Sequence, residues 1–259
     1  MRITVFVIFL CLPGFVSAQR IEKTDLDSLA ANRDKLVSVQ KQSPRKLKSF
    51  IIPAIFLGYG AISLGNNAIR DLDFSTKNEL QEDHPTFANH LDDYSRFAPA
   101  VAFYGLSLMG VKSKHGVADG TGLYILSEAI MSATTFGAKR LADRNRPDGS
   151  NNYSFPSGHT ASAFAAAEFL NQEYRDVSPW IGYAGYTVAA ATGALRLYNN
   201  KHWVSDVVAG AGFGIASTKL AYLIYPLLKR GLFGKQKVSY SMVPLYQQKA
   251  VGMSFSGVF

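Results

Sequence analysis

The sequence predicts an all-α protein, a bundle of about six helices with an optional short β-hairpin at its C-terminus. Two observations carry this prediction. Apolar segments of helical length alternate with polar connections from residue 50 onward. Small residues also recur four positions apart within these segments, which lets helices pack closely. The pairs are Ala161/Ala165, Ala189/Gly193 and Gly210/Gly214.

The first 18 residues are typical of a secretory signal peptide, and residues 19–49 form a charged leader. Arg2 supplies the positive start, an apolar run follows it, and residues 16–18 supply small residues for cleavage. An uncleaved membrane anchor is the alternative interpretation. The single cysteine, Cys11, lies inside this segment, so we expect neither disulfides nor thiol chemistry in the mature protein.

Six segments are then expected to be helical. They span residues 50–65, 97–111, 120–138, 157–170, 177–195 and 203–228. We expect one domain over residues 50–234, because a chain of 259 residues is long enough for one sizeable core. The tail, residues 235–259, has two loosely alternating runs on either side of Gln248 and Lys249, which can pair as a hairpin. Pro244 limits the first of these runs to an edge position or a bulge.

Charge and hydropathy do not decide whether the bundle lies in a membrane or in water. The formal net charge is +8, with basic clusters at residues 45–48 and 229–237 that suit anionic lipid or an ordinary solvated surface. Export by a signal peptide argues against nucleic acid as a partner. Glu128 and Lys219 interrupt two of the apolar segments, and others are short. The composition therefore fits a membrane-embedded bundle or a soluble one.

The fourth segment opens with an unusual sequence, Pro156 followed by Ser157, Gly158 and His159. At a helix N-terminus, free backbone N–H groups and the helix dipole favour an anion. Gly158 permits close approach of the backbone, and Ser157 can add a hydroxyl donor. The plainer interpretation is a serine N-cap that follows a turn.

Charged side chains lie on both sides of this turn. Lys139 and Arg146 precede it, and Arg196, His202 and Asp206 follow it. The separation of four predicts that His202 and Asp206 share a helix face, where the carboxylate holds one ring nitrogen and leaves the other free. Three cations suit a phosphate dianion without a metal. The mature chain also lacks an HExxH motif and cysteine ligands, so we expect no metal site.

The order K-x6-R-P, P-S-G-H and R-x5-H-x3-D, from Lys139 to Asp206, resembles the signature of the type 2 phosphatidic acid phosphatase and vanadium haloperoxidase superfamily. The resemblance implies a helical bundle of the phosphatidic acid phosphatase type over residues 50–234. It also implies a phosphatase that works through a phosphohistidine with no metal and no cofactor. Leu195 departs from the family, which usually has a small or polar residue there, and the link between Pro147 and Pro156 is short.

The resemblance assigns a role to each matching residue. His202 is the nucleophile, Asp206 orients it, and His159 is the general acid. The other matching residues bind the phosphoryl oxygens and stabilise charge in the transition state. They are Lys139, Arg146, Ser157, Gly158 and Arg196.

Several functions stay open after the resemblance. The leading one is a bacterial cell-envelope phosphatase that acts on a phosphorylated lipid such as lipid A, a polyprenyl diphosphate or a phosphatidate-type lipid. It would be embedded in or associated with the membrane, with its site facing the periplasm. The alternatives are a soluble exported nonspecific acid phosphatase, a vanadium haloperoxidase and a non-enzymatic envelope module. The lipid and the oligomeric state are left open.

Overall fold

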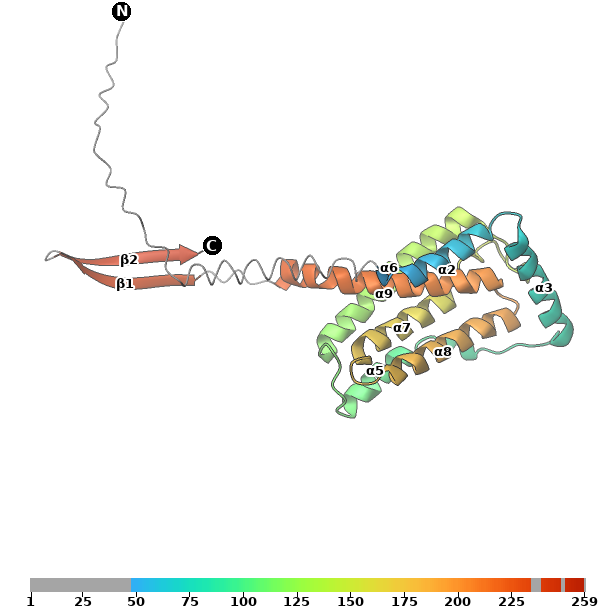
Figure 1. Ribbon diagram of the computed structural model, residues 1–259, viewed down its shortest axis with the longest axis horizontal. Helices are drawn as coiled ribbons and strands as arrows, with labels where there is room; N and C mark the ends of the chain where they lie inside the picture. The colour runs from blue at the N-terminus through green and yellow to red at the C-terminus, as the bar shows by residue number, and fades with distance from the viewer. Residues whose placement is uncertain (1–47, 234–238, 248–249, 259) are drawn as a thin grey trace, which may run out of the picture. The chain divides into compact units, whose positions relative to one another are not determined.

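A computed structural model describes residues 48–233, 239–247 and 250–258, and the side chains of residues 48–231. The expected signal peptide and nearly all of the expected leader lie outside these residues. The described residues form eight helices and two strands (Figure 1). In chain order they are α2 (Ile51–Ile62), α3 (Ala68–Asp83), α4 (Leu91–Ser95), α5 (Ala98–Leu108), α6 (Val117–Ala142), α7 (Gly158–Tyr174), α8 (Pro179–Tyr198), α9 (Val204–Phe233), β1 (Ser239–Gln247) and β2 (Ala250–Val258).

The expected all-α bundle is confirmed, since α2 and α5 to α9 correspond to the six predicted segments. Local sequence explains several of the observed ends. Pro179 occupies the first turn of α8, where a missing N–H costs nothing. Asp143 ends α6 by adopting a left-handed conformation with a φ of 44°. The end of α6 therefore turns sharply into the loop that carries Arg146.

Two helices between residues 66 and 96, α3 and α4, were not predicted. Asn67 caps α3, because its side-chain oxygen accepts the N–H groups of Ile69 and Arg70. The sequence of α3 is mostly polar, and α4 has only five residues, so neither has a strong apolar period. Both helices bring acidic side chains to the functional site described below.

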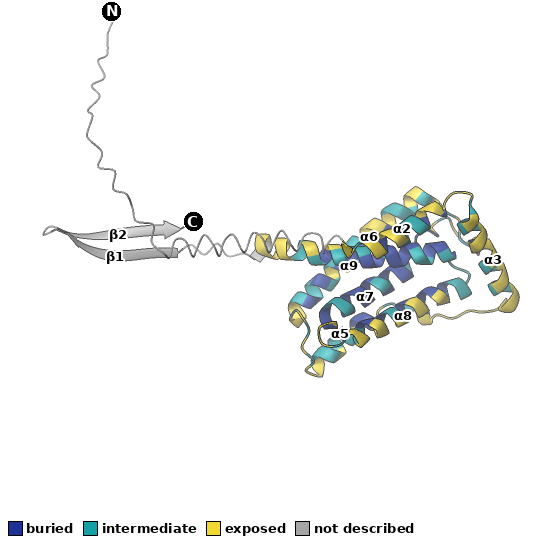
Figure 2. Ribbon diagram, viewed as in Figure 1, coloured by how far each residue is buried: buried dark blue, intermediate teal, exposed yellow. Residues whose placement is uncertain are grey.

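The most buried helix is α7, which packs against α6, α8 and α9 (Figure 2). Its alanines, Ala161 and Ala165 among them, are fully buried. The expected close packing of small residues is confirmed. A Cβ atom at Gly210 of α9 would lie 2.6 Å from the carbonyl oxygen of Ser157, and one at Gly214 would collide with that of Ala161. The starts of α7 and α9 are thus held together by backbone contact.

The tail forms the expected hairpin. β1 and β2 pair antiparallel, with Ser239 opposite Val258 and Gln247 opposite Ala250. Pro244 lies within β1. Both strands of a two-stranded sheet are edge strands, which is where proline is tolerated.

Candidate active site

Four helix ends meet at one end of the bundle. α6 and α8 end there, and α7 and α9 begin there. The backbone N–H of Ser157 donates to the carbonyl oxygen of Asp206 at 3.0 Å, which joins the starts of α7 and α9 directly. These helix ends and the loop after α6 carry every site residue expected from the sequence. They are Lys139, Arg146, Ser157, Gly158, His159, Arg196, His202 and Asp206.

His202 and Asp206 form a buried pair. Nδ1 of His202 faces Oδ2 of Asp206 at 3.6 Å, which leaves Nε2 as the other reactive nitrogen of the ring. Burial lowers the pKa of His202 to about 4, because the charged ring would lose its hydration, and the opposing effect of Asp206 is smaller. The neutral imidazole, the form that can act as a nucleophile, therefore predominates at neutral pH.

One detail of the predicted geometry is wrong, because His202 and Asp206 do not share a helix. α9 begins at Val204, and His202 lies in the turn before it. Oδ2 of Asp206 accepts the N–H of Trp203 at 3.0 Å, as the third helical residue does in a capping box. The carboxylate is thus part of the helix start, and the turn folds the imidazole back towards it.

Ser157 is the N-cap of α7, and its expected contact with phosphate stays a prediction. Its Oγ accepts the N–H of Thr160 at 3.5 Å and lies 2.9 Å from the Thr160 hydroxyl. The start of α7 also offers an anion its backbone N–H groups. A Cβ atom at Gly158 would meet only Cε of Lys139, at 3.9 Å. The space beside Gly158 is open on the side of that cation.

His159 is bonded to a residue that the sequence did not single out. Its Nε2 lies 2.8 Å from Oδ1 of Asp93 in α4. Burial and the nearby Arg196 lower the pKa of His159, and the bond to Asp93 raises it by a smaller amount. His159 thus belongs to a second imidazole–carboxylate pair, at the start of α7.

Three cationic side chains surround this region. Nζ of Lys139 donates to the carbonyl oxygens of Tyr153 at 2.8 Å and Pro156 at 2.6 Å. Burial, together with the charge of Arg146, lowers the pKa of Lys139 to about 8. Among the described residues, Nε of Arg146 and Nε of Arg196 are buried without a hydrogen-bond partner. Phosphate oxygens are acceptors that suit such guanidinium groups.

Asp92 pairs with Arg196 through Nη1, and both side chains are buried. Together with Asp93 and His159 it forms a group that could offer ligands to a metal ion. Ion pairs account for this group, because Asp92 is bonded to Arg196 and Asp93 to His159. The only sequence signal for these residues was a pair of adjacent carboxylates shortly before the second apolar segment.

The comparison of sequences finds the family that the motif from Lys139 to Asp206 resembles. Residues 120–230 match the family model of the PAP2 superfamily. This segment belongs to the PAP2 superfamily. This PAP2 segment, residues 120–230, contains all eight expected site residues, whereas Asp92 and Asp93 precede it. The carboxylates that pair with Arg196 and His159 therefore come from a part of the chain outside the match.

One curated relative is similar to part of the chain. Lipid A 1-phosphatase of Porphyromonas gingivalis is 40% identical to the chain over 149 residues, which cover 56% of this chain and 33% of that protein. The match thus spans about a third of the length of this curated relative.

Two solved structures are also similar. One is a transmembrane PAP2-type phosphatidylglycerolphosphate phosphatase from Bacillus subtilis, with a TM-score of 0.49, 20% identity, and coverage of 71% of this chain and 98% of that one. The other is LpxE of Aquifex aeolicus, with a TM-score of 0.43, 20% identity, and coverage of 56% and 93%.

A cavity of about 350 Å³ lies beside His159 and is lined by residues of α6, the start of α7 and the turn before α5. Apolar residues of its wall are Phe97, Met131 and Phe136, and Glu128 and Lys139 are among the polar ones. Burial raises the pKa of Glu128 to about 7. A second cavity of about 300 Å³ shares Phe136 and Lys139 with the first and is also lined by Arg140 and Tyr153. The imidazole and the ammonium group thus border a partly apolar hollow.

Proposed function

We propose that this chain is a cell-envelope phosphatase that hydrolyses a phosphomonoester or a pyrophosphate on a lipid through a phosphohistidine. The observation that carries the proposal is the meeting of a buried, neutral imidazole, backed by Asp206, with three cationic side chains at the start of α7. Two of these cations have unpaired buried N–H groups. Together they can neutralise a phosphate dianion, so the proposed reaction needs no metal.

In the first step, Nε2 of His202 attacks phosphorus and the bond from phosphorus to the lipid oxygen breaks. His159 gives its proton to that oxygen, so the lipid leaves in protonated form. Asp206 faces Nδ1 at 3.6 Å and stabilises the positive charge that develops on the ring. The cations and the N–H of Gly158 stabilise the charge on the other phosphoryl oxygens.

In the second step, water attacks the phosphohistidine and gives a proton to His159. The bond from phosphorus to nitrogen breaks, its electron pair returns to Nε2 of His202, and inorganic phosphate leaves. Both histidines are then back in their starting forms. Uncatalysed phosphate-monoester hydrolysis is so slow that accelerations of up to ~10²¹ are known. Positioning and electrostatic stabilisation must therefore act together.

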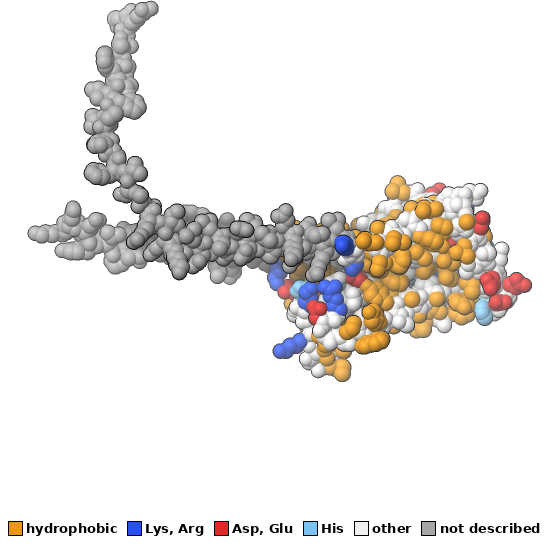
Figure 3. Space-filling view, in the orientation of Figure 1, with side chains coloured by type: hydrophobic (Ala, Val, Ile, Leu, Met, Phe, Trp, Pro, Cys, Tyr) orange, Lys and Arg blue, Asp and Glu red, His pale blue; other side chains and the backbone are white. Residues whose placement is uncertain are grey.

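A lipid is proposed as the phosphate carrier because the bundle exposes much apolar surface. The cavity beside His159 is partly apolar, and large apolar side chains such as Ile55, Val101 and Ile125 are exposed on the helices. Figure 3 shows hydrophobic side chains gathered over one face of the bundle. Among the described residues, Val204–Gly231 is long and apolar enough to cross a membrane, and half of its most apolar window is buried in the protein. Such a surface suits contact with acyl chains.

The orientation we propose places the site on the periplasmic side. The signal peptide expected in residues 1–18 supports this orientation, because it would export the domain. Basic residues do not decide the orientation, since lysines and arginines lie at both ends of the bundle, with Arg144, Arg146 and Lys201 at the end that carries the site.

Within phosphorylated lipids we favour a lipid A-type glycolipid, because the relative at 40% identity bears that name. Polyprenyl diphosphates and phosphatidate-type lipids are the competing substrates. A soluble exported acid phosphatase is a second candidate. It is favoured by the shortness of α2 and α5, with 12 and 11 residues, compared with the ~20 that a spanning helix needs.

The test is a panel assay of phosphate release by the full chain, with His202→Ala as the control. The panel holds lipid A, a polyprenyl diphosphate, a phosphatidate and the water-soluble ester p-nitrophenyl phosphate. We expect kcat/KM to be at least tenfold higher on one lipid than on the soluble ester. Equal values on both classes, with release of the protein from membranes by salt alone, would favour the soluble phosphatase. No release from any substrate would refute both.

A further inference from the structure

Arg144 links two buried carboxylates at the candidate active site. Its Nη1 lies 2.9 Å from Oδ1 of Asp206, and its Nη2 lies 2.7 Å from Oδ2 of Asp73 in α3. Both carboxylates have fully buried side chains, and the side chain of Arg144 is 10% exposed. Asp73 is fixed in turn by the N–H of Ser205 at 2.9 Å and by its hydroxyl at 2.5 Å.

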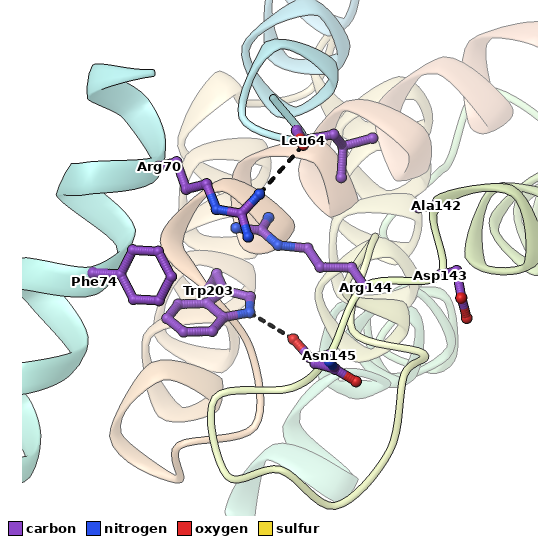
Figure 4. A pocket seen from close by; sticks show the side chains of 8 residues that line it. All are labelled: Leu64, Arg70, Phe74, Ala142, Asp143, Arg144, Asn145 and Trp203. Atoms are coloured by element: carbon purple, nitrogen blue, oxygen red, sulfur yellow. Dashed lines mark hydrogen bonds between the residues drawn. The ribbon is translucent and has the colours of Figure 1, made fainter. Parts of the chain in front are cut away.

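Both Nη atoms of the Arg144 guanidinium contact polar groups of the protein. Besides the two carboxylates, Nη1 lies 2.8 Å from Oγ of Ser205 and 3.3 Å from Oγ of Ser63. Figure 4 shows the side chain running from the loop after α6 past the ring of Trp203, whose centroid lies 5.4 Å from Cζ. Both Nη atoms of Arg144 are thus committed to groups of the protein and do not point to a phosphate contact. Its role must lie in what it holds.

We propose that Arg144 is a positioning residue that fixes the carboxylate of Asp206 against His202, with Asp73 as its second counter-ion. The inference rests on the proposed function, in which His202 is the nucleophile. Asp206 uses Oδ1 for Arg144, whereas Oδ2 accepts from Ser154 and Trp203 and faces Nδ1 of His202. Without Arg144 the Oδ1 atom would lose its contact with Arg144, and the carboxylate would be held only through Oδ2.

A cavity beside Arg144 makes a sharp test possible. It has a volume of about 340 Å³ and is lined by Leu64, Arg70, Phe74, Ala142, Asp143, Arg144, Asn145 and Trp203 (Figure 4). Small solutes can therefore reach the space that truncation of Arg144 would create. Arg70 is the matched control, because it lines the same cavity but donates to the carbonyl oxygen of Leu64, at 3.4 Å, rather than to Asp206.

The experiment is a double-mutant cycle on phosphate release, with Arg144→Ala, Asp206→Asn, the double variant and Arg70→Ala. We expect Arg144→Ala to lower kcat by ~10²-fold with KM within a few-fold of wild type, since misplacement near 1 Å costs about that much. The double variant should be no slower than Asp206→Asn, because both changes remove the same function. Arg70→Ala should keep the wild-type kcat. Additive losses, or an unchanged kcat in Arg144→Ala, would overturn the inference.

Chemical rescue supplies the second readout. Guanidinium ions far below denaturing concentration should raise kcat of Arg144→Ala and leave Arg144→Ala/Asp206→Asn unchanged. Equal rescue of both would mean that guanidinium does not act through Asp206. If Arg144→Ala does not fold, Arg144→Lys takes its place in the same cycle. Lysine keeps the positive charge but lacks the planar guanidinium group that reaches both carboxylates. If the wild-type enzyme releases phosphate but the losses in Arg144→Ala and Asp206→Asn add up in the double variant, only this inference is overturned. If the wild-type enzyme releases no phosphate, the proposed function is overturned.

Discussion

Arg196 of α8 and Asp92 of α4 form a buried ion pair within the candidate phosphate site. Asn199 donates to the other oxygen of Asp92 at 3.1 Å, which holds α4 against the end of α8. The Asp92 carboxylate contacts Nη1 of Arg196, while Nε of the same arginine is buried without a hydrogen-bond partner in the described residues. Asp92 therefore balances the charge of Arg196 and leaves Nε of the Arg196 guanidinium to donate to an anion.

The first prediction is that Asp92→Asn destabilises the free protein by ~3–5 kcal/mol, because it leaves a buried guanidinium without its counter-ion. Vanadate, an anion of phosphate-like geometry, would restore part of this charge balance. Thermal unfolding with and without vanadate should therefore show a larger stabilisation of Asp92→Asn than of wild type. Asp93→Asn is the control, since that side chain is 45% exposed and pairs with His159. Equal vanadate shifts in wild type and Asp92→Asn would contradict the idea.

The second prediction separates the two histidines. His202→Ala should abolish phosphate release from every substrate and give no phosphoenzyme, because it lacks the attacking nitrogen. His159→Ala should lose ~10²–10⁴-fold on a lipid phosphate but much less in the first step on p-nitrophenyl phosphate, whose leaving group needs no proton. With that ester, a phosphoenzyme should accumulate. Acid-quench trapping with labelled substrate measures it, and a trapped phosphoenzyme in His202→Ala would exclude that residue as the nucleophile.

The third prediction concerns pH. The proposed mechanism needs His202 neutral and His159 protonated. Burial lowers the pKa of His202 to about 4, so kcat/KM should fall only as pH drops towards that value. Burial and Arg196 hold the pKa of His159 below its ordinary value, so kcat/KM on a lipid should decline as pH rises through a point below ~6.5. We therefore expect a bell-shaped profile with an acidic optimum.

Asp93 provides the check on this profile. Its hydrogen bond raises the pKa of His159, so Asp93→Asn should move the alkaline limb to lower pH and leave the acid limb in place. On p-nitrophenyl phosphate, which needs no general acid in the first step, the alkaline limb should weaken. If the alkaline limb has the same position in Asp93→Asn as in wild type, it reports the titration of a group other than His159.

The fourth prediction concerns metals. Because three cationic side chains supply the charge that a metal would supply, activity should survive a chelator such as EDTA unchanged. Vanadate should inhibit, since it adopts the five-coordinate geometry of phosphoryl transfer. Inhibition by the chelator that magnesium or zinc reverses would count against this site.

The features of this protein that could be predicted are those that depend on residues close together in the sequence. The six apolar segments are long enough to be recognised one at a time, and residues 139–206 carry their motif at fixed spacing. Even within this motif, spacing alone placed His202 on the last helix, although that helix begins after it. His202 and Asp206 stand four residues apart, as on a helix, but the bond from the Trp203 N–H to Asp206 begins the helix only at Val204.

The missed part depends on contacts between distant segments. Arg144 and Asp73 are 71 residues apart, and Arg196 and Asp92 are 104 apart. α3 and α4 are polar or short, so they gave no apolar period, and an isolated aspartate in such a segment looks like any solvated residue. Only the folded structure shows that these carboxylates are the buried counter-ions of the site.

The last prediction tests the cavity beside His159 as a binding site for the lipid. Phe136 lines both cavities that adjoin Lys139 and is 59% exposed. An acyl chain lying there would cover this ring, so Phe136→Ser should cost ~1–2 kcal/mol of binding in the transition state, part of the value for a fully buried phenylalanine. We expect a ~5–30-fold lower kcat/KM on the long-chain lipid and no change on p-nitrophenyl phosphate.

Leu141→Ser is the matched control for this change. Leu141 is on the same helix and is 89% exposed, but it lines neither cavity. If both serine variants lower lipid hydrolysis equally, the effect reflects general contact of α6 with the lipid surface. If Phe136→Ser also loses activity on the soluble ester, the ring supports Lys139 or His159 instead of the acyl chain. A selective loss in Phe136→Ser alone would place the chain between α5, α6 and α7, with its phosphate at the start of α7.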